Sequence, residues 1–230
     1  MRYCVSDLHG EYGLFLKLLD KINFCEGDEL YVLGDIIDKG DSSVRLLKYI
    51  SERDNIHCIL GNHEHAFLEY YHSLLEESPD DFCEVLSRLR EYFPKDGHLL
   101  DFELVDWLES LPAYIEGDGF VCVHAGVPVK PDGTLLPLAE ATVNQLVFDR
   151  RFKNKDTRHS SPVCVFFGHT QTDNVCGRPV VLGYKRRADA PSDSLSSFYK
   201  IHLDTGTWSN GVLGCFCIDT CKTVYARKPV

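Results

Sequence analysis

Six residues with metal-binding side chains are spread over the chain in five short motifs. Each motif places aspartate, asparagine or histidine close to a glycine, directly after an apolar run. In chain order the motifs are Asp7-Leu8-His9-Gly10, Gly34-Asp35-Ile36-Ile37-Asp38-Lys39-Gly40, Gly61-Asn62-His63-Glu64, His124-Ala125-Gly126 and Gly168-His169-Thr170. Glycine permits the sharp turns and close backbone approach that a crowded site requires.

The donor set combines oxygen and imidazole ligands without thiolate, which suits Mn²⁺, Fe or Zn²⁺ better than a soft metal ion. Six ligands are too many for one catalytic ion with an open position, whereas they suit two ions about 3.5–4 Å apart. Asp35 is the natural carboxylate to bridge the two ions. The candidate ligands are Asp7, His9, Asp35, Asn62, His124 and His169. The sequence therefore predicts two divalent metal ions, with Mn²⁺ as the first expectation.

Each motif taken alone also has a structural explanation, because an aspartate beside a histidine often caps a turn and G-D-x-x-D recurs in loops. Five motifs in this order, at equivalent positions, are much harder to explain in that way. The chemistry they would support is phosphoester hydrolysis. Metal-bound water reaches a pKa near ~7, and a histidine is suited to protonate a leaving alkoxide near neutral pH.

The elements that must position these motifs alternate in the first half of the chain. We expect short strands at residues 3–6, 29–33 and 56–60, separated by amphipathic helices at 14–22 and 42–50. This order predicts parallel strands with right-handed crossovers. Side chains at the carboxyl ends of such strands meet at one edge of the sheet, where α/β folds place their active sites.

The remainder of the chain has a different pattern. Residues 64–111 are expected to be helical with a polar exterior, and residues 183–197, basic and then serine-rich, are expected to form a loop. Further short strands are expected at 114–115, 120–124, 163–168, 180–182, 199–203, 212–218 and 223–226. The fold we expect is α/β, with two mixed β-sheets packed as a sandwich and flanked by helices, in a single domain spanning residues 1–230.

Composition restricts the classes of function. The chain has 230 residues, 44% of them hydrophobic, and a net charge of −11 at pH 7. Such a surface should repel nucleic acid and anionic membranes, so a bound phosphate needs a local positive site. No apolar run approaches the roughly 20 residues of a membrane helix. Because the first motif begins by residue 7, we find no room for a signal peptide and expect a cytoplasmic protein.

Ten cysteines could indicate disulfides or a metal site. Several lie inside strand-like apolar runs, where cysteine behaves as a small buried hydrophobe. Cys215, Cys217 and Cys221 form a C-x-C-x3-C cluster. Alternating strand positions are the favoured interpretation of this cluster, because no fourth ligand stands at zinc-finger spacing.

The five motifs, in this order, resemble those of the calcineurin-like metallophosphoesterases. More narrowly they are similar to the phosphoprotein phosphatases, especially compact phage and bacterial members such as lambda phosphatase. The resemblance extends over residues 3–206. It implies one metal held by Asp7, His9 and Asp35, with Asp35 bridging, and a second metal held by Asn62, His124 and His169.

The resemblance also implies roles for four residues outside the ligand set. His63 would donate a proton to the leaving alcohol, and Asp38 would orient it. Arg150, at the end of the segment 145–150, would bind the substrate phosphate. Lys39 stands where the family usually has arginine, and it offers a point charge without the bidentate fork of a guanidinium.

Three functions are consistent with these residues. The leading hypothesis is a metal-dependent phosphomonoesterase, a serine/threonine protein phosphatase with phosphotyrosine as a further substrate, in which a metal-bridging hydroxide attacks phosphorus. The alternative is a symmetrical diadenosine tetraphosphate hydrolase, whose position matching Asp38 is typically not aspartate. The third is a binding protein with a relict site. Asp38 and the small number of cationic residues favour the phosphatase, so we expect a phosphorylated protein or peptide as partner, and neither nucleic acid nor a membrane.

Overall fold

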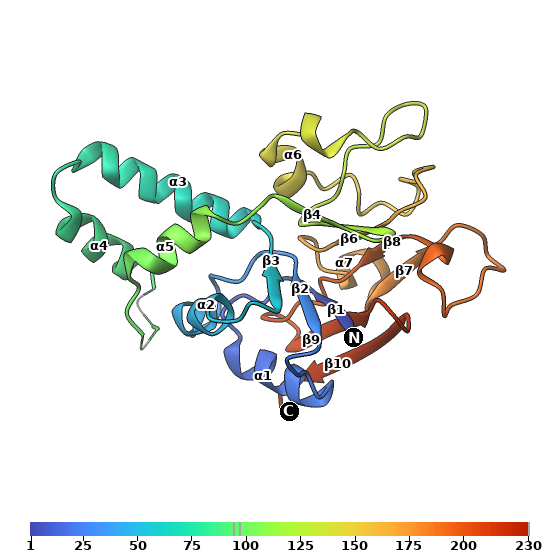
Figure 1. The fold of residues 1–230 in the computed structure, drawn as a ribbon, viewed down its shortest axis with the longest axis horizontal. Coiled ribbons are helices and arrows are strands. Elements are labelled where there is room, and N and C mark those ends of the chain that lie inside the picture. Colours follow the sequence, from blue (N-terminus) through green and yellow to red (C-terminus); the bar gives the residue numbers. More distant parts are fainter. Residues whose placement is uncertain (94, 97, 230) are drawn as a thin grey trace.

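The computed structural model describes residues 1–93, 95–96 and 98–229. Two five-stranded mixed β-sheets form its centre, and helices flank them (Figure 1). The strand order is β10-β9-β1-β2-β3 in the first sheet and β4-β5-β6-β8-β7 in the second. The predicted fold class is therefore confirmed.

The first sheet combines strands from both ends of the chain. Strands β1, β2 and β3 run parallel, β9 pairs antiparallel with β1, and β10 pairs antiparallel with β9. Its strands are β1 (Arg2–Val5), β2 (Glu29–Val32), β3 (Ile56–Cys58), β9 (Val212–Cys217) and β10 (Lys222–Arg227). The predicted β-α-β-α-β order is confirmed, because α1 (Tyr12–Lys21) and α2 (Ser43–Ser51) connect the parallel strands.

The second sheet has three parallel strands at its centre and an antiparallel strand at each edge. Its strands are β4 (Tyr114–Gly117), β5 (Phe120–Val123), β6 (Cys164–Phe167), β7 (Leu182–Lys185) and β8 (Phe198–His202). The prediction of a loop over residues 183–197 is wrong at its start, because β7 pairs with β8 there. Backbone pairing at a sheet edge does not require apolar side chains, so the basic composition of this segment concealed the strand.

The two sheets share a buried core. Cys4, Leu33 and Ile59 from the first sheet pack with Cys122 and Phe166 from the second. Such face-to-face packing gives a sandwich whose strand ends can meet at one edge. Cys215 and Cys217 lie buried in β9, as the strand interpretation of the cysteine cluster predicts, and all ten cysteines are free.

The helices α3 (Asn62–Glu77), α4 (Phe82–Glu91) and α5 (Phe102–Glu109) pack together and project from the sheets as a helical arm, residues 62–109 (Figure 1). Two shorter helices, α6 (Val143–Phe148) and α7 (Asp173–Cys176), lie beside the second sheet. Within the described residues, no helix combines the length and hydropathy of a membrane-spanning segment.

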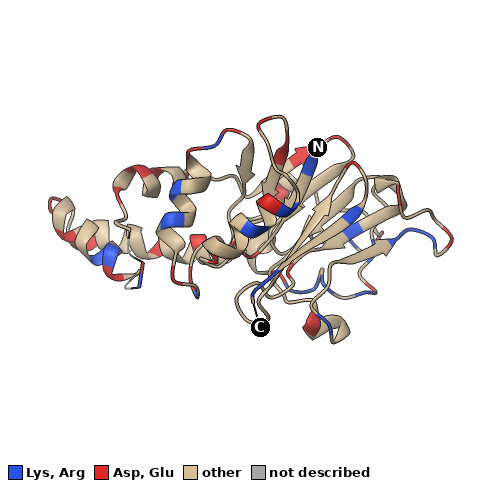
Figure 2. Ribbon diagram, turned by 90° about the horizontal axis from the view of Figure 1, so that it is seen from below, with Lys and Arg blue, Asp and Glu red and all other residues tan. Residues whose placement is uncertain are grey.

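The helical arm carries most of the net charge of the chain. Residues 62–109 contain thirteen Asp and Glu and three Lys and Arg, which is a net charge of −10 out of −11. Figure 2 shows acidic residues along the helices of the arm. The rest of the chain is nearly neutral, so the overall charge does not describe the electrostatic field around the sheets.

Candidate metal centre

The six candidate ligands lie just beyond the carboxyl ends of five parallel strands from both sheets. Asp7 and His9 follow β1, Asp35 follows β2, Asn62 follows β3, His124 follows β5 and His169 follows β6. Contacts join motifs that are far apart in sequence. The backbone N–H of His169 donates to Asp7 Oδ2 at 3.0 Å, across 162 positions of sequence.

Asp35 stands between two groups of donors. Its Oδ2 is 3.7 Å from His9 Nε2, and its Oδ1 is 3.3 Å from His124 Nε2. Asp7 Oδ1 is 4.0 Å from the same nitrogen of His9. One carboxylate therefore faces both groups, which is the position that a bridging ligand occupies.

The second group consists of two imidazoles and an amide. Asn62 Oδ1 lies 3.0 Å from His124 Nε2 and 2.7 Å from His169 Nδ1. The two imidazole nitrogens are themselves 3.2 Å apart. Three potential lone pairs that converge in this way are the arrangement expected around a cation.

Backbone carbonyls set the tautomers of two of these histidines. The Nδ1–H of His9 donates to Ile37 O at 3.0 Å, and the Nδ1–H of His124 donates to Leu33 O at 2.6 Å. Both Nε2 atoms are left as acceptors that face the site, as in metal-binding histidines. His169 Nε2 is buried and has no hydrogen-bond partner among the described residues.

Burial keeps the imidazoles of His9 and His169 neutral. It lowers the pKa of His9 to about 4. Burial, followed by the charges of His124 and Arg150, lowers the pKa of His169 to about 3. Neutral imidazole is the form that binds a metal ion.

The carboxyl group of Asp35 is disfavoured in its charged form. Burial, followed by the charges of Asp7 and Glu64, raises the pKa of Asp35 well above its ordinary value. A divalent cation would relieve this crowding of negative charge. The donor chemistry and the electrostatics both fit two divalent metal ions.

The backbone around the site is strained. Among the described residues, eight non-glycine residues have a positive φ, and six of them are candidate site residues. The six are Asp7 (54°), His9 (46°), Asp35 (53°), Asp38 (69°), Lys39 (66°) and His169 (67°). Each such residue costs about 1–2 kcal/mol, and strain of this kind concentrates at functional sites.

Two glycines allow the loops to approach one another. A Cβ atom at Gly168 would collide with the side chains of Ser6 and Asp7. A Cβ atom at Gly61 would collide with the backbone nitrogen and the carboxylate of Asp35. Gly168 thus lets strand ends of the two sheets meet, and Gly61 lets two neighbouring strand ends of the first sheet meet.

The candidate general acid is paired as expected. The Nδ1–H of His63 donates to Asp38 Oδ2 at 2.6 Å, and its Nε2 lies 3.8 Å from Asp35 Oδ2. Burial alone would lower the pKa of His63, but the hydrogen bond with Asp38 and the charge of Asp35 raise it above its ordinary value. The ring is partly exposed, so its Nε2 can reach a ligand in the site.

The two candidate cations differ in their surroundings. Lys39 Nζ donates to His9 Nε2 at 2.7 Å and is thus in the metal centre itself. Arg150 is exposed just beyond α6 and has no hydrogen bond or ion pair within the described part of the chain. Its neighbour Arg151 pairs with Asp149 instead. Arg150 is therefore free to bind an anion.

The sequence analysis missed two supporting residues. Glu64 is fully buried, and its carboxylate accepts the backbone N–H groups of four residues after β2 and β3, namely Asp35, Ile36, Ile37 and Gly61. Its place as the last residue of G-N-H-E was the available signal. Tyr92, from the helical arm, donates its hydroxyl to Asp38 Oδ2 at 3.4 Å. No local pattern marks Tyr92, because its role depends on how the arm folds back.

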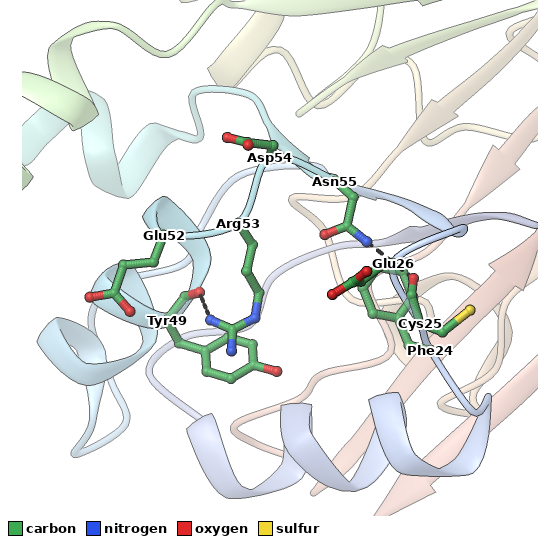
Figure 3. A pocket seen from close by; sticks show the side chains of 8 residues that line it. All are labelled: Phe24, Cys25, Glu26, Tyr49, Glu52, Arg53, Asp54 and Asn55. Atoms are coloured by element: carbon green, nitrogen blue, oxygen red, sulfur yellow. Dashed lines mark hydrogen bonds between the residues drawn. The ribbon is translucent and has the colours of Figure 1, made fainter.

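A cavity of about 630 Å³ lies away from the metal centre, near the amino ends of β2 and β3 (Figure 3). Two hydrogen bonds and one stacking contact join residues that line it. Arg53 donates to Tyr49 O at 2.6 Å and stacks over the Tyr49 ring, while Asn55 donates to Cys25 O at 3.2 Å. None of the candidate site residues lines it.

Comparison with known proteins identifies the family. Residues 3–193 match the model of the calcineurin-like phosphoesterases. The chain is 34% identical over 134 residues to a symmetrical bis(5'-nucleosyl)-tetraphosphatase of Haemophilus ducreyi, covering 56% of this chain and 46% of that protein. It is 30% identical over 168 residues to the protein of the same name from Chromobacterium violaceum, covering 68% and 57%. The chain spans about half the length of the curated relatives it matches.

Solved structures show the same fold. A putative diadenosine tetraphosphatase superposes with a TM-score of 0.70 and 17% identity, over 98% of this chain and 92% of that one. A serine/threonine phosphatase from Saccharomyces cerevisiae superposes with a TM-score of 0.55 and 15% identity, over 100% and 80%. Identities this low show the fold and leave the substrate open. Because the family model covers most of the sequence, the chain belongs to the calcineurin-like phosphoesterases.

Proposed function

We propose that this protein is a two-metal hydrolase that cleaves symmetrical dinucleoside tetraphosphates into two nucleoside diphosphates. The observation that carries the proposal is the position of Asp35, whose two oxygens lie 3.7 Å from His9 Nε2 and 3.3 Å from His124 Nε2. The substrate class follows from the curated relatives, which are named symmetrical bis(5'-nucleosyl)-tetraphosphatases.

The prediction of a serine/threonine protein phosphatase acting on a phosphorylated protein or peptide is wrong. The relatives that share 34% and 30% identity with this chain carry the tetraphosphatase name. Asp38 was the main argument for the phosphatase. It does bond to His63, but this pair acts on the leaving oxygen and does not recognise what the leaving group carries.

The net charge was the second argument against a polyphosphate, and it fails for a physical reason. The helical arm holds −10 of the −11 charges. Apart from buried Glu64, its acidic residues are exposed or partly exposed, and salt screens exposed charges at a distance. The phosphate chain would meet the local field of the strand ends, where Lys39 and Arg150 are the candidate cations.

We assign the metal ligands as the sequence predicts. Asp7, His9 and Asp35 would hold one ion, and Asn62, His124 and His169 would hold the other, with Asp35 shared. Divalent ions bound there acidify water and neutralise the charge on phosphate oxygens. Mn²⁺ is our first choice, and Fe and Zn²⁺ accept the same donors.

The reaction adds one water molecule across the central P–O–P linkage. The water oxygen joins one of the two middle phosphorus atoms, and the bridging oxygen leaves with the other phosphate. His63, held by Asp38, donates a proton to that departing oxygen. Arg150 binds phosphate oxygens with its fork of donors, while Lys39 offers a single positive charge.

The test compares kcat/KM for diadenosine tetraphosphate and for a phosphothreonine peptide, using one Mn²⁺-loaded preparation. We expect the dinucleotide to be preferred by more than about tenfold, or about 1.4 kcal/mol, with ADP as the sole nucleotide product. A higher kcat/KM for the peptide would contradict the proposed substrate class. Release of AMP and ATP would contradict the proposed cleavage at the central linkage.

A further inference from the structure

A cavity of about 350 Å³ opens beside the metal centre. This volume lies in the usual range of ligand pockets, about 300–1,000 Å³. Four separate parts of the chain line it: the start of α1, the loop before α2, the segment between α4 and α5, and the carboxy-terminal region. The lining residues that matter here are Glu11, Lys39, Asp41, Lys95, Trp208 and Lys228.

The cavity adjoins the candidate metal centre through Gly10 and Lys39. Gly10, which lines it, directly follows the candidate ligand His9. Lys39 lines it as well, and its Nζ lies 2.7 Å from His9 Nε2. A ligand bound at the metal centre can therefore extend into this cavity.

The charged groups of the cavity favour an anion. Three lysines face two carboxylates: Lys228 pairs with Glu11 at 2.6 Å, and Lys95 pairs with Asp41 at 3.5 Å. The second pair is mostly exposed, and exposed pairs contribute little energy, so a bound phosphate can replace the carboxylate. The local balance is positive although the chain has a net charge of −11.

Helix termini add to this field. The helix α1 begins at Tyr12 and α2 at Ser43, directly after residues that line the cavity. Neither N-cap side chain accepts a hydrogen bond from its helix, although Asp96 accepts the N–H of Val44 in α2. The amino end of a helix attracts phosphate oxygens through its backbone N–H groups.

Trp208 gives the cavity an aromatic surface. Its side chain is 49% exposed, unusually open for a residue of this size. The turn that carries it is held by hydrogen bonds from Gly206 N–H to Asp204 Oδ1 at 2.9 Å and from Asn210 N–H to Gly206 O at 2.7 Å. An indole on a fixed turn is a stacking surface for a nucleobase.

We propose that this cavity binds one nucleoside diphosphate half of the substrate, an inference that rests on the proposed function. The two phosphates extend from the metal centre past Lys39 towards Lys95 and Lys228. The base stacks on the indole of Trp208. The cavity thereby selects a nucleotide over a simple phosphate ester.

The experiment measures ADP affinity by calorimetry on the Mn²⁺-loaded protein, with inorganic phosphate as the second probe. We expect Trp208→Ala to weaken ADP binding about tenfold and phosphate binding about twofold or less. Trp208→Phe should recover most of the ADP affinity. Equal ADP affinity in Trp208→Ala and wild type would overturn the proposal, and so would an equal loss for both probes.

The lysines are tested in the same way. Lys228→Met and Lys95→Met should each weaken ADP binding about three- to tenfold, with a reduced dependence on salt. Lys222→Met, an exposed lysine on β10, and Phe82→Ala, an exposed aromatic on α4, are the matched controls. Unchanged ADP affinity in both cavity variants would count against the phosphate path.

ADP is a product and is not consumed, so the two proposals can fail separately. If diadenosine tetraphosphate is not cleaved but ADP binding depends on Trp208, the proposed function fails and the nucleotide cavity stands. If the dinucleotide is cleaved but Trp208→Ala changes neither its KM nor ADP affinity, the cavity proposal fails. Thermal unfolding of each variant checks that the fold is intact.

Discussion

Among single residues, Glu64 holds the loops that carry the candidate ligands. Its Oε2 accepts the N–H groups of Asp35 and Gly61, and its Oε1 accepts those of Ile36 and Ile37. Each oxygen therefore serves two backbone donors in a fully buried position. Glu64 therefore fixes the backbone of the loops that carry the candidate ligands, although it does not bind the substrate.

Replacing this carboxylate by an amide tests that role. In Glu64→Gln, either orientation of the amide turns its NH₂ group towards two backbone N–H donors. We expect the free energy of unfolding to fall by about 2–4 kcal/mol, measured by urea denaturation. Glu69→Gln, on the exposed side of the same helix, is the control. Equal midpoints for wild type and Glu64→Gln would contradict this account.

A substitution at His63 can distinguish proton transfer from metal binding. His63→Asn should retain near-normal metal content, because the neighbouring Asn62 and not His63 is assigned as the ligand. Its kcat should fall by roughly 10²–10⁴, the usual contribution of a general acid. The measurement compares two aryl phosphates, and the loss should shrink for the more acidic leaving group. An equal loss of kcat for both aryl phosphates would show that His63 does not act as the general acid.

At the scale of elements, the sequence predicted the strands that precede the ligand motifs. It did not predict the residues that approach the site from distant parts of the chain. Alternating apolar runs placed β1, β2, β3, β5 and β6 correctly, and each ligand motif follows its strand directly in sequence. A motif next to its own strand is local information, so one sequence suffices to find it. Tyr92 and Trp208 reach the site only through the fold, which no local pattern encodes.

Buried Lys200 on β8 also makes contacts with a distant part of the chain that no local pattern encodes. Its Nζ donates to the carbonyl oxygens of Phe152 and Asn154, both at 2.7 Å, and of Thr157 at 3.0 Å. These carbonyls belong to the segment that follows Arg150. One ammonium group thus ties the segment after a candidate phosphate ligand to the second sheet.

Removing this ammonium should loosen the segment. Lys200→Met retains the apolar stem but leaves one buried and two partly buried carbonyls without their donor, which should cost about 3 kcal/mol. Hydrogen exchange should increase at residues 152–157, and KM should rise because Arg150 is less well positioned. Lys222→Met on β10 is the control. Unchanged exchange in Lys200→Met would show that other contacts order the segment.

At the scale of the whole molecule, the net charge is distributed unevenly. The helical arm carries −10 of it, although Asn62, His63 and Tyr92 of the arm also contribute to the candidate site. Overall charge therefore misled the prediction of substrate. The ligand set extends from residue 7 to residue 169, so the metal centre also depends on how the two sheets pack.

A metal centre in which two ions share Asp35 should bind a defined number of ions per chain. Mass spectrometry under native conditions and calorimetric titration with Mn²⁺ should both give two ions per chain. Asp35→Ala should bind fewer than one ion, while Asp38→Asn, in the same loop, should still bind two. Chelation should abolish hydrolysis, and Mn²⁺ should restore it. A single ion in the wild-type protein, two ions in Asp35→Ala or full activity after chelation would contradict the account.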